Sequence, residues 1–364
     1  MNKKNNILMI SSTSQKGGGP KHMFLLREIF ENQLNIFIAC PKIDMPEITA
    51  NNYIEISERK ITVFDTLRLI FFIKKNSIKI VHCHGKGAGA IGRLLKLFIN
   101  IKLVYTFHGI HIKFYGLLGR YLYIIYERLM GILDDYKVFV SKGELSFAKE
   151  NKIYIGKNYK VIENAVKNKK IRLLNNLDKK NIFNDYQNTK NIFKVNIISI
   201  CRLVDQKNIF EIFEIAKLLK NFRFNIIGNG YLATKAKLFL EKEGINNVVL
   251  YGQKNNIYNF LYDSDLFLST SLYEGLPLSL IEAMSIGLPV VASNVVGNRD
   301  VVINNKTGFL YQLGKYDIAA ESIQRIINSD KLIREFSQNS FERQRKYFSI
   351  NNMKKKYLSL YGSF

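Results

Sequence analysis

The sequence predicts an α/β protein built from two Rossmann-like domains, each with a parallel sheet. Short apolar runs alternate with helical patterns, which is typical of strand–helix–strand units. The alternation starts near the N-terminus and again near residue 196, and the stretch 166–190 between the halves has no clear periodicity. The chain of 364 residues also exceeds the roughly 250 to 300 residues at which a single core stops growing. These observations indicate two domains in series.

Each expected strand is a run of four or five mostly apolar residues. In the first half the strands are expected at 7–10, 35–39, 79–82, 103–107, 136–140 and 159–162. In the second half they are expected at 196–199, 224–227, 248–251, 266–269, 289–292 and 308–311. We therefore expect a first domain over 1–166, a linker over 167–190, a second domain over 191–345, and a C-terminal helix over 346–364 that crosses back to the first domain.

The composition excludes several classes of protein. Hydrophobic residues make up 47% of the chain, too many for a disordered protein. The three cysteines are widely spaced and form no C-x-x-C, which argues against a disulfide scaffold and suits a reducing cytoplasm. The N-terminal apolar stretch lacks a cleavage pattern, so we expect no signal peptide. No segment reaches the roughly 20 apolar residues needed to span a bilayer.

The formal net charge of +24 is distributed unevenly. From residue 66 to residue 126 there are ten bases and no acid, whereas residues 191–300 carry eleven bases and ten acids. A basic first lobe would suit a nucleic acid, an anionic membrane surface or anionic small molecules. A general enrichment of the chain in Asn, Ile and Lys explains the abundance of lysine but not the missing acids.

The stretch 273–284, YEGLPLSLIEAM, has the richest chemistry in the chain. We expect Pro277 at the first position of a helix that runs to Ile286 and stops at Gly287. The amides of Leu278 and Ser279 would then be free to bind an anion such as a phosphate. Glu274 before the helix and Glu282 within it place a carboxylate on each side, as a phosphorylated sugar requires. The alternative is a capped helix with two exposed glutamates.

Two bases follow the first strand of the second half. Arg202 and Lys207 lie in the loop that opens the next helix, at the carboxyl end of a strand, where ligands bind in open α/β sheets. Two cations there would stabilise a leaving diphosphate. The alternative is that both side chains are simply solvated.

Together these features resemble the donor-binding domain of glycosyltransferase family 4, retaining enzymes of the GT-B fold that include bacterial surface-polysaccharide types. The resemblance rests on the following features: Arg202 with Lys207, the turn 228–230, the pair Glu274 and Glu282 in an E-G-x-P setting, and the stretch 287–293. It covers nearly the whole chain and is strongest over 198–310. It implies two Rossmann-like domains that face each other across a cleft, the first binding the acceptor and the second the nucleotide sugar.

The resemblance also implies roles for single residues of the second domain. Arg202 and Lys207 would bind the donor diphosphate, near the amides of Leu278 and Ser279 and the turn at Gly228. Glu282 would bind the nucleotide ribose. Glu274 would bind a hydroxyl of the transferred sugar.

In the first domain, the glycines 17–19 (Gly17, Gly18 and Gly19) resemble the family's loop after the first strand, where the backbone approaches donor phosphate and acceptor. His108 resembles the histidine that lines the donor sugar pocket. Three positions depart from the family pattern: Cys201 replaces Gly, Glu163-Asn164-Ala165 replaces Pro-Asn-Gly, and Asp300 replaces Glu. They concern the loop and hinge more than the charges, so they leave the activity in place and the substrate open.

Three other motifs carry less weight. The stretch 87–92 matches G-x-G-x-x-G, but the ribose-binding acid expected about 20 residues on is missing, so we interpret it as close helix packing. Asp263-Ser264-Asp265 has a D-x-D form and precedes a buried strand, so we predict no metal. His82, Cys83 and His84 do not have the spacing of a structural zinc site, and alternation places both histidines on one face of a strand. We expect core or acceptor-pocket roles for them.

The stretch 115–130 mixes aromatic residues and arginine inside the acid-free segment. It is interpreted as packing on the first sheet, with a membrane interface as the alternative.

The prediction is a metal-independent, retaining glycosyltransferase without a cofactor. It would transfer a sugar from a UDP-linked nucleotide-sugar donor to a lipid-linked saccharide acceptor of the lipopolysaccharide or capsule type. We expect it in the cytoplasm, peripheral on the inner face of the cytoplasmic membrane and attracted to the anionic membrane surface, without nucleic acid as a partner. The alternatives are a nucleotide-sugar epimerase on the same fold and a basic nucleic-acid-binding protein.

Overall fold

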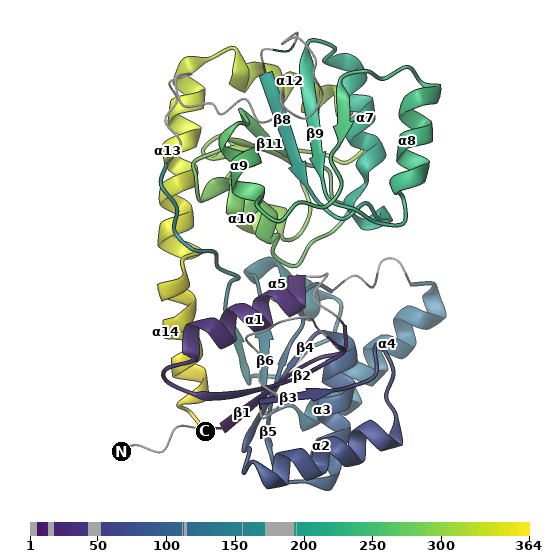
Figure 1. The fold of residues 1–364 in the computed structure, drawn as a ribbon, viewed down its shortest axis with the longest axis vertical. Helices are drawn as coiled ribbons and strands as arrows, with labels where there is room; N and C mark the ends of the chain where they lie inside the picture. Colours follow the sequence, from purple (N-terminus) through teal and green to yellow (C-terminus); the bar gives the residue numbers. More distant parts are fainter. Residues whose placement is uncertain are drawn as a thin grey trace. The chain divides into compact units, whose positions relative to one another are not determined.

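The computed structural model describes residues 6–13, 18–42, 52–110, 112, 115–154, 156–171, 193 and 195–364. It divides into two compact units, one formed by Met1–Asn164 with Ile350–Phe364 and the other by Ala165–Ser349 (Figure 1). The second unit thus begins slightly before the expected boundary at 166. Residues 167–171 of the expected linker belong to the second unit, and residues 172–190 lie outside the described part.

The first unit contains a seven-stranded parallel sheet in the order β3-β2-β1-β4-β5-β6-β7. Its strands are β1 (Asn6–Ser11), β2 (Asn35–Cys40), β3 (Tyr53–Glu55), β4 (Ile80–His84), β5 (Lys102–Thr106), β6 (Tyr136–Phe139) and β7 (Tyr159–Val161). Its helices are α1 (Gly18–Phe30), α2 (Val63–Lys75), α3 (Lys86–Phe98), α4 (Leu117–Met130), α5 (Lys142–Glu150) and α14 (Ile350–Tyr361). Strand β3 was not predicted because it is only three residues long and ends in a charged residue.

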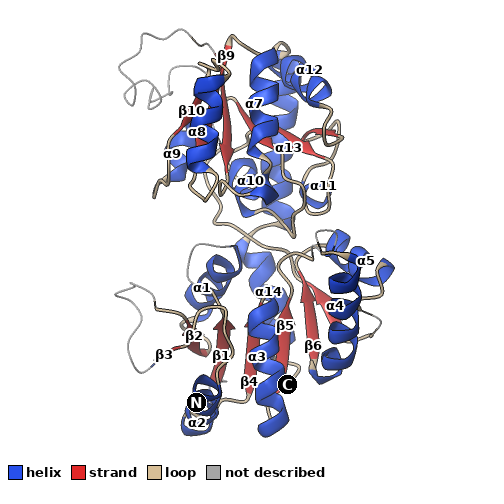
Figure 2. Cartoon of the chain, turned by 90° about the vertical axis from the view of Figure 1, so that its right-hand side faces the viewer, coloured by secondary structure: helices blue, strands red, loops and turns tan. Residues whose placement is uncertain are grey.

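The second unit contains a six-stranded parallel sheet in the order β10-β9-β8-β11-β12-β13. Its strands are β8 (Val195–Ile200), β9 (Phe222–Ile227), β10 (Val248–Leu250), β11 (Leu266–Ser269), β12 (Val290–Ser293) and β13 (Gly308–Tyr311). Its helices are α7 (Ile209–Leu218), α8 (Ala233–Lys242), α9 (Ile257–Tyr262), α10 (Leu278–Met284), α11 (Asn298–Val301), α12 (Tyr316–Ile327) and α13 (Asp330–Tyr347). Helices lie on both faces of each sheet (Figure 2).

The predicted fold class, two Rossmann-like parallel sheets, is confirmed. In each sheet the strand order reverses next to the first strand of the unit, between β1 and β4 and between β8 and β11. Ligands of open α/β sheets bind beyond the carboxyl ends of the strands at such a switch point. The loops after β1, β4, β8 and β11 are therefore the first places to look for a site.

The expected C-terminal helix 346–364 corresponds to α14, which starts four residues later, after α13 has ended at Tyr347. The carbonyl of Phe348 accepts hydrogen bonds from the amide of Val166, at 3.1 Å, and from Nε2 of Gln344, at 3.2 Å. These bonds engage the backbone where α13 ends, and α14 starts at Ile350 and belongs to the first unit. Buried Tyr361 anchors α14, because its hydroxyl lies 2.7 Å from Nδ1 of His82 on β4.

The stretch 87–92 packs closely against the sheet, as predicted. A Cβ atom added at Gly92 would lie 2.4 Å from Sγ of Cys83, and one at Gly89 would lie 2.8 Å from the ring of Tyr105. Real Cβ atoms do not approach other atoms so closely. These glycines therefore let α3 rest directly on β4 and β5.

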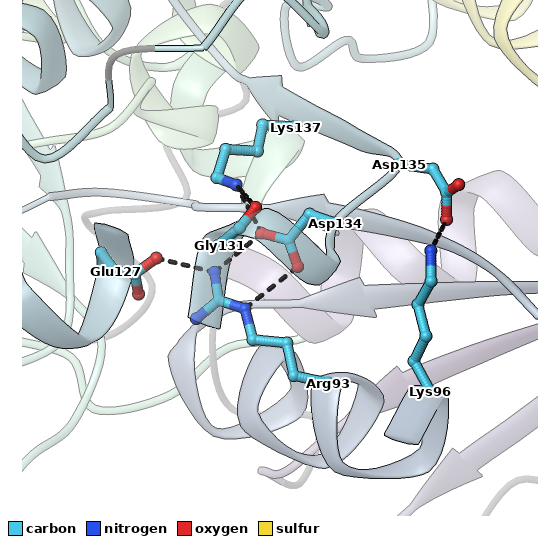
Figure 3. Close-up of polar contacts among 7 residues, drawn as sticks. All are labelled: Arg93, Lys96, Glu127, Gly131, Asp134, Asp135 and Lys137. Carbon is cyan, nitrogen blue, oxygen red and sulfur yellow. Dashed lines mark hydrogen bonds and ion pairs between the residues drawn. The ribbon is translucent and has the colours of Figure 1, made fainter. Parts of the chain in front are cut away.

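This close packing buries a cluster of four charges, shown in Figure 3. Arg93 on α3 donates to Glu127 at 2.7 Å and to Asp134 at 2.8 Å. Lys137 lies 2.6 Å from Asp134. All four side chains are at most 4% exposed, and two positive charges balance two negative ones, which is the condition for burying ions.

The charge of the acid-free segment 66–126 is thus partly neutralised inside the fold. Arg93 is paired as described, and Lys96 and Lys102 both pair with Asp135. The acids that compensate these three bases follow the segment in the sequence at 127–135. The local charge of this lobe is smaller than the sequence count indicates.

Candidate functional site

The loop after β8 is held by two glycines of the next strand's turn. A Cβ atom at Gly228 would lie 1.9 Å from the carbonyl oxygen of Cys201, and φ there is +139°. A Cβ atom at Gly230 would lie 2.2 Å from the carbonyl oxygen of Leu203. Both positions therefore require glycine. Arg202 between these contacts is exposed, and its Nη2 lies 3.5 Å from Oε1 of Gln206.

The loops after β8 and β11 are tied together by hydrogen bonds. The amide of Leu272 donates to the carbonyl of Gln206 at 2.9 Å, and Nε2 of Gln206 donates to the carbonyl of Tyr273 at 3.0 Å. Oγ1 of Thr270 donates to the carbonyl of Lys207 at 2.9 Å. The predicted residues Arg202, Lys207 and Glu274 are thus held in one place at the switch point of this sheet.

Lys207 and Glu274 form a direct ion pair with little exposure to water. Their side chains are 15% and 8% exposed, and Oε1 of Glu274 also accepts a hydrogen bond from Oγ of Ser271 at 2.7 Å. A lysine ammonium carries three N–H groups, so Lys207 can keep Glu274 and still donate to an anion. Lys207 is thus paired and largely shielded from water, whereas Arg202 is exposed.

Helix α10 begins one residue later than predicted. Pro277 has extended backbone angles and precedes the helix, which starts at Leu278 and ends at Met284 rather than Ile286. Leu278 and Ser279 are its first two residues, and amides at these positions have no acceptor within a helix. The chain leaves the helix through Gly287 at φ +81°.

Glu282 lies on α10 and is half-buried. Its charge acts on Tyr258 of α9, because the pKa of Tyr258 is raised to about 12, first by burial and then by the negative charge of Glu282. The carbonyl of Glu282 accepts from Oγ of Ser285 at 2.6 Å. Glu282 is therefore one helix turn beyond the free amides, on the same short helix.

The three departures from the family pattern have local roles. Burial raises the pKa of Cys201 to about 11, so this thiol stays protonated and acts as a packing group. Oδ2 of Asp300 accepts from the amide of Gly297 at 3.2 Å, and a Cβ atom at Gly297 would lie 2.6 Å from Cβ of Glu274. Asp300 thus supports the backbone against which Glu274 rests. Glu163 pairs with Lys356 of α14 within the first unit.

The D-x-D motif is structural. Asp265 Oδ2 accepts from the amide of Asn196 at 2.9 Å, and Oγ of Ser264 donates to the carbonyl of Phe260 at 2.7 Å. Both contacts lie at the amino ends of β8 and β11, opposite the carboxyl ends where Glu274 follows. This agrees with the interpretation from sequence.

In the first unit, Gly19 and His108 lie together beyond the carboxyl ends of the strands. A Cβ atom at Gly19 would lie 3.5 Å from Cδ2 of His108. Gly18 and Gly19 start α1 rather than lying in a loop, and Gly17 lies outside the described residues. His108 has φ +60° and Gly109 has φ +115°, so the backbone turns sharply at this point.

Three histidines gather here. Nδ1 of His84 lies 3.0 Å from Nε2 of His108, and the ring of His22 lies 5.0 Å from that of His108 and 5.6 Å from that of His84. Burial lowers the pKa of His108 to about 3 and holds the pKa values of His22 and His84 well below their ordinary range. All three imidazoles are therefore neutral and can each donate one hydrogen bond and accept another.

Among the described residues these histidines are the group that could hold a metal ion. Their ligating nitrogens all lie within 4.8 Å of one another. A metal-bound histidine normally donates its second ring N–H to an acceptor, yet neither ring nitrogen of His22 has a hydrogen-bond partner within the described part of the chain. The neutral imidazoles can also form hydrogen bonds with a polar ligand.

Two family models match the chain, on separate stretches. The model described as Glycosyltransferase Family 4 matches residues 24–168, and the model described as Glycosyl transferases group 1 matches residues 178–343. Together they span most of both units. The chain belongs to glycosyltransferase family 4.

Two glycosyltransferases of Escherichia coli are similar to this family 4 chain. The Escherichia coli UDP-Gal:alpha-D-GlcNAc-diphosphoundecaprenol alpha-1,3-galactosyltransferase is 36% identical over 125 residues, 34% of this chain and 32% of the relative. The chain thus aligns with about a third of that relative's length. The Escherichia coli O-antigen biosynthesis glycosyltransferase WbnH is 25% identical over 319 residues, 86% of this chain and 88% of the relative.

Solved structures agree with the fold. Anabaena HepE in complex with UDP and glucose has a TM-score of 0.81 at 16% identity, covering 99% of this chain and 100% of HepE. At this identity the likeness shows the fold alone. The expected GT-B fold is confirmed for this family 4 chain.

Three residues near these sites were not predicted. Glu144 is 1% exposed, and its two carboxylate oxygens accept from the amides of Gly109, at 2.5 Å, and Val140, at 2.8 Å, so it holds the turn that carries His108. His22 and Ser271 were also missed. His22 follows the glycines by one helix turn, a spacing that could have placed it beside His108 in this family 4 chain.

Proposed function

We propose that the chain transfers a sugar from a UDP-linked donor to a lipid-linked saccharide of the lipopolysaccharide or capsule type, with retention of the anomeric configuration. The observation that carries this proposal is the juxtaposition of Arg202 with the Lys207–Glu274 pair at the switch point of the second sheet. Two cations and a carboxylate within two interlocked loops fit a sugar diphosphate.

In this proposal the second unit binds the donor. Arg202 and Lys207 offset the charge that develops on the diphosphate as its bond to the anomeric carbon breaks. Glu274 accepts a hydrogen bond from a sugar hydroxyl, and Glu282 accepts from the ribose. The acceptor oxygen forms the new bond to the anomeric carbon, and its proton passes to a phosphate oxygen of the donor. Catalysis then rests on positioning and charge stabilisation.

The first unit would bind the acceptor and the sugar. His108, with His22 and His84 beside it, offers neutral hydrogen-bonding groups for hydroxyls. The name of the galactosyltransferase relative includes a UDP-sugar and a diphosphoundecaprenol acceptor, which supports both parts of the proposal. It also supports a peripheral location on the inner face of the cytoplasmic membrane. No helix in the described part of the chain is long and apolar enough to cross a bilayer.

We further propose that the reaction needs neither a metal ion nor a cofactor, and that nucleic acid is not a partner. The D-x-D motif supports the proposal that no metal is needed, since the side chains of Ser264 and Asp265 are engaged in backbone hydrogen bonds at the amino ends of the strands.

The test is a thermal-shift panel with UDP, GDP, ADP, CMP and a short DNA, each with and without EDTA. A ligand at 100 times its dissociation constant adds about 2.7 kcal/mol to the free energy of unfolding. We expect stabilisation by UDP that survives EDTA and is lost in Arg202→Ala and in Glu282→Ala. Lys237→Ala serves as the control, because Lys237 is an exposed base on α8.

A transfer assay then follows with UDP-sugars and a diphospho-lipid-linked saccharide, and NMR of the product reads the anomeric configuration. Stabilisation by another nucleotide would change the assignment of the donor nucleotide but would still agree with a transferase. Release of an epimerised sugar without acceptor would contradict the transferase. Stabilisation by DNA alone would contradict the site assignment.

A further inference from the structure

Helix α2 has an apolar stripe on its outward face. Val63, Phe64, Leu67 and Phe71 are 60% to 78% exposed. Their spacing places all four within a stripe roughly 100° wide on one side of the helix. The opposite side packs into the core through Leu69 and Ile73. A helix on the surface of a water-soluble domain normally carries polar residues on its outward face, so α2 is apolar on both sides.

Helix α4 repeats this arrangement. Leu117, Leu118, Tyr121 and Leu122 are 56% to 89% exposed, and Leu129 in the last turn is 65% exposed. Their spacing again defines one outward stripe, while Tyr123 and Ile124 pack against the core. The interpretation of this segment as packing on the first sheet is therefore correct only for its inward side.

The two stripes belong to neighbouring elements of one layer. Helix α3 contacts α2, and Arg93 of α3 bonds Glu127 of α4 at 2.7 Å. Figures 1 and 2 both show α3 between α2 and α4. The end of α3 adds two more apolar side chains, Leu97 at 58% and Phe98 at 65% exposure. These exposed apolar side chains are concentrated on three neighbouring helices, whereas exposed apolar residues on a monomer are normally scattered.

The charges on these helices have one sign on the outside. Both acids of α2 and α4, Asp65 and Glu127, are buried at 8% and 2% exposure. The bases of the two helices are all outside the core: Arg68, Lys74, Lys75, Arg120 and Arg128. The guanidinium of Arg68 lies 5.4 Å from the ring centre of Phe64, at the edge of the stripe. Apolar stripes flanked by bases are the composition that binds the interface of an anionic bilayer.

We propose that the outward faces of α2 and α4 form a docking surface for an anionic lipid bilayer. The proposal deepens the proposed function, because it rests on a lipid-linked acceptor and says which face of the first unit meets the lipid. The apolar stripes enter the headgroup boundary and the flanking bases contact lipid phosphates. A second copy of the chain is the competing occupant, and it would be favoured by apolar contact without a need for anionic lipid.

The test is co-sedimentation with vesicles of phosphatidylethanolamine and phosphatidylglycerol, compared with vesicles of phosphatidylcholine alone. Two variants remove the stripes: Val63→Ser/Phe64→Ser/Phe71→Ser on α2, and Leu117→Ser/Leu118→Ser/Tyr121→Ser on α4. The matched control is Leu238→Ser/Ile318→Ser, since both side chains are exposed on the second unit, at 60% and 44%. Circular dichroism checks that each variant is folded.

We expect binding to the anionic vesicles that falls about tenfold or more in each stripe variant and is unchanged in the control. Binding should also weaken by about fivefold for each base removed, as in Lys74→Gln, and at high salt. Equal binding by the stripe variants and the wild type, or no binding by the wild type, would overturn the proposal. So would a dimer in solution that the stripe variants dissociate while vesicles bind none of the proteins.

The same variants separate this proposal from the proposed function. Stabilisation by UDP and transfer to a water-soluble, short-chain acceptor should be unchanged in them. If vesicle binding depends on the stripes but the protein transfers no sugar, the docking surface is supported and the proposed transferase activity is contradicted. If the protein transfers sugar to the water-soluble acceptor but binds no vesicles, the transferase activity is supported and the docking surface is contradicted.

Discussion

Replacing Glu144 tests whether a buried carboxylate positions His108. The side chain is 1% exposed and accepts from two backbone amides, those of Gly109 and Val140. Glu144→Ala leaves both amides without this acceptor. A buried donor that loses its partner costs about 1 to 3 kcal/mol, so the free energy of unfolding should fall by about 2 to 6 kcal/mol.

The effect should reach activity through the turn. His108 and Gly109 both have positive φ, and that turn loses one of its supports in the variant. We expect a lower kcat for transfer, with stabilisation by UDP unchanged, because the residues proposed to bind the donor lie in the second unit. Glu144→Gln keeps one carbonyl acceptor, so its kcat should lie between those of Glu144→Ala and the wild type.

Urea unfolding measures the loss of stability, and a transfer assay well below the melting temperature measures kcat. Glu150→Ala is the control, since Glu150 is exposed on the same helix. An unchanged free energy of unfolding in Glu144→Ala would refute the hydrogen-bond argument. A loss of stability with an unchanged kcat would refute the positioning role.

Three further predictions concern other parts of the fold. Gly228→Ala places a Cβ atom 1.9 Å from the carbonyl oxygen of Cys201 at φ +139°. We expect the free energy of unfolding in urea to fall by about 1 to 3 kcal/mol or more, and stabilisation by UDP to be lost. A thermal shift with UDP equal to that of the wild type would contradict this. Arg93→Ala leaves two buried carboxylates with a single remaining cation and should cost about 3 to 5 kcal/mol, whereas the exposed-base variant Lys75→Ala should cost less than about 0.5 kcal/mol. Burial lowers the pKa values of both His82 and His108 to about 3, so the unfolded chain binds protons below about pH 6.5 that the folded chain does not. Stability should therefore be complete above pH 6.5 and fall by up to about 1.4 kcal/mol per pH unit for each such histidine as the pH decreases towards 3; a flat stability profile between pH 7 and pH 5 would contradict the burial of neutral imidazoles.

The two-unit α/β organisation could be predicted because its signals are local. A short apolar run bounded by turn residues and alternating with helical patterns is typical of a buried strand, and the restart of the pattern after residue 190 marks a second sheet. The Glu274–Glu282 spacing and the bases at 202 and 207 are also readable along the chain. To predict that these residues lie close together, one further rule is needed: the carboxyl ends of parallel strands lie at the same edge of the sheet.

Local signals were less reliable at the ends of elements. From the sequence, Pro277 could be the first residue of α10 or precede it. Its extended backbone angles show that it precedes the helix. Where α13 ends, the amide of Val166 donates to the carbonyl of Phe348, and these two residues are far apart in the sequence. A helical pattern that continues across position 348 cannot reveal such a partner.

The sequence by itself determined the fold class, the family and the polar residues of the loops after β8 and β11, because each depends on a pattern within a short window. Only the tertiary structure decided which charges face water and which are buried. The acid-free segment looked uniformly basic until Arg93 was found buried beside Glu127, while the apolar stripes of α2 and α4 were found outside. The physical reason is that burial depends on partners brought together by folding, such as Arg93 and Glu127, and the distance along the chain does not reveal such partners.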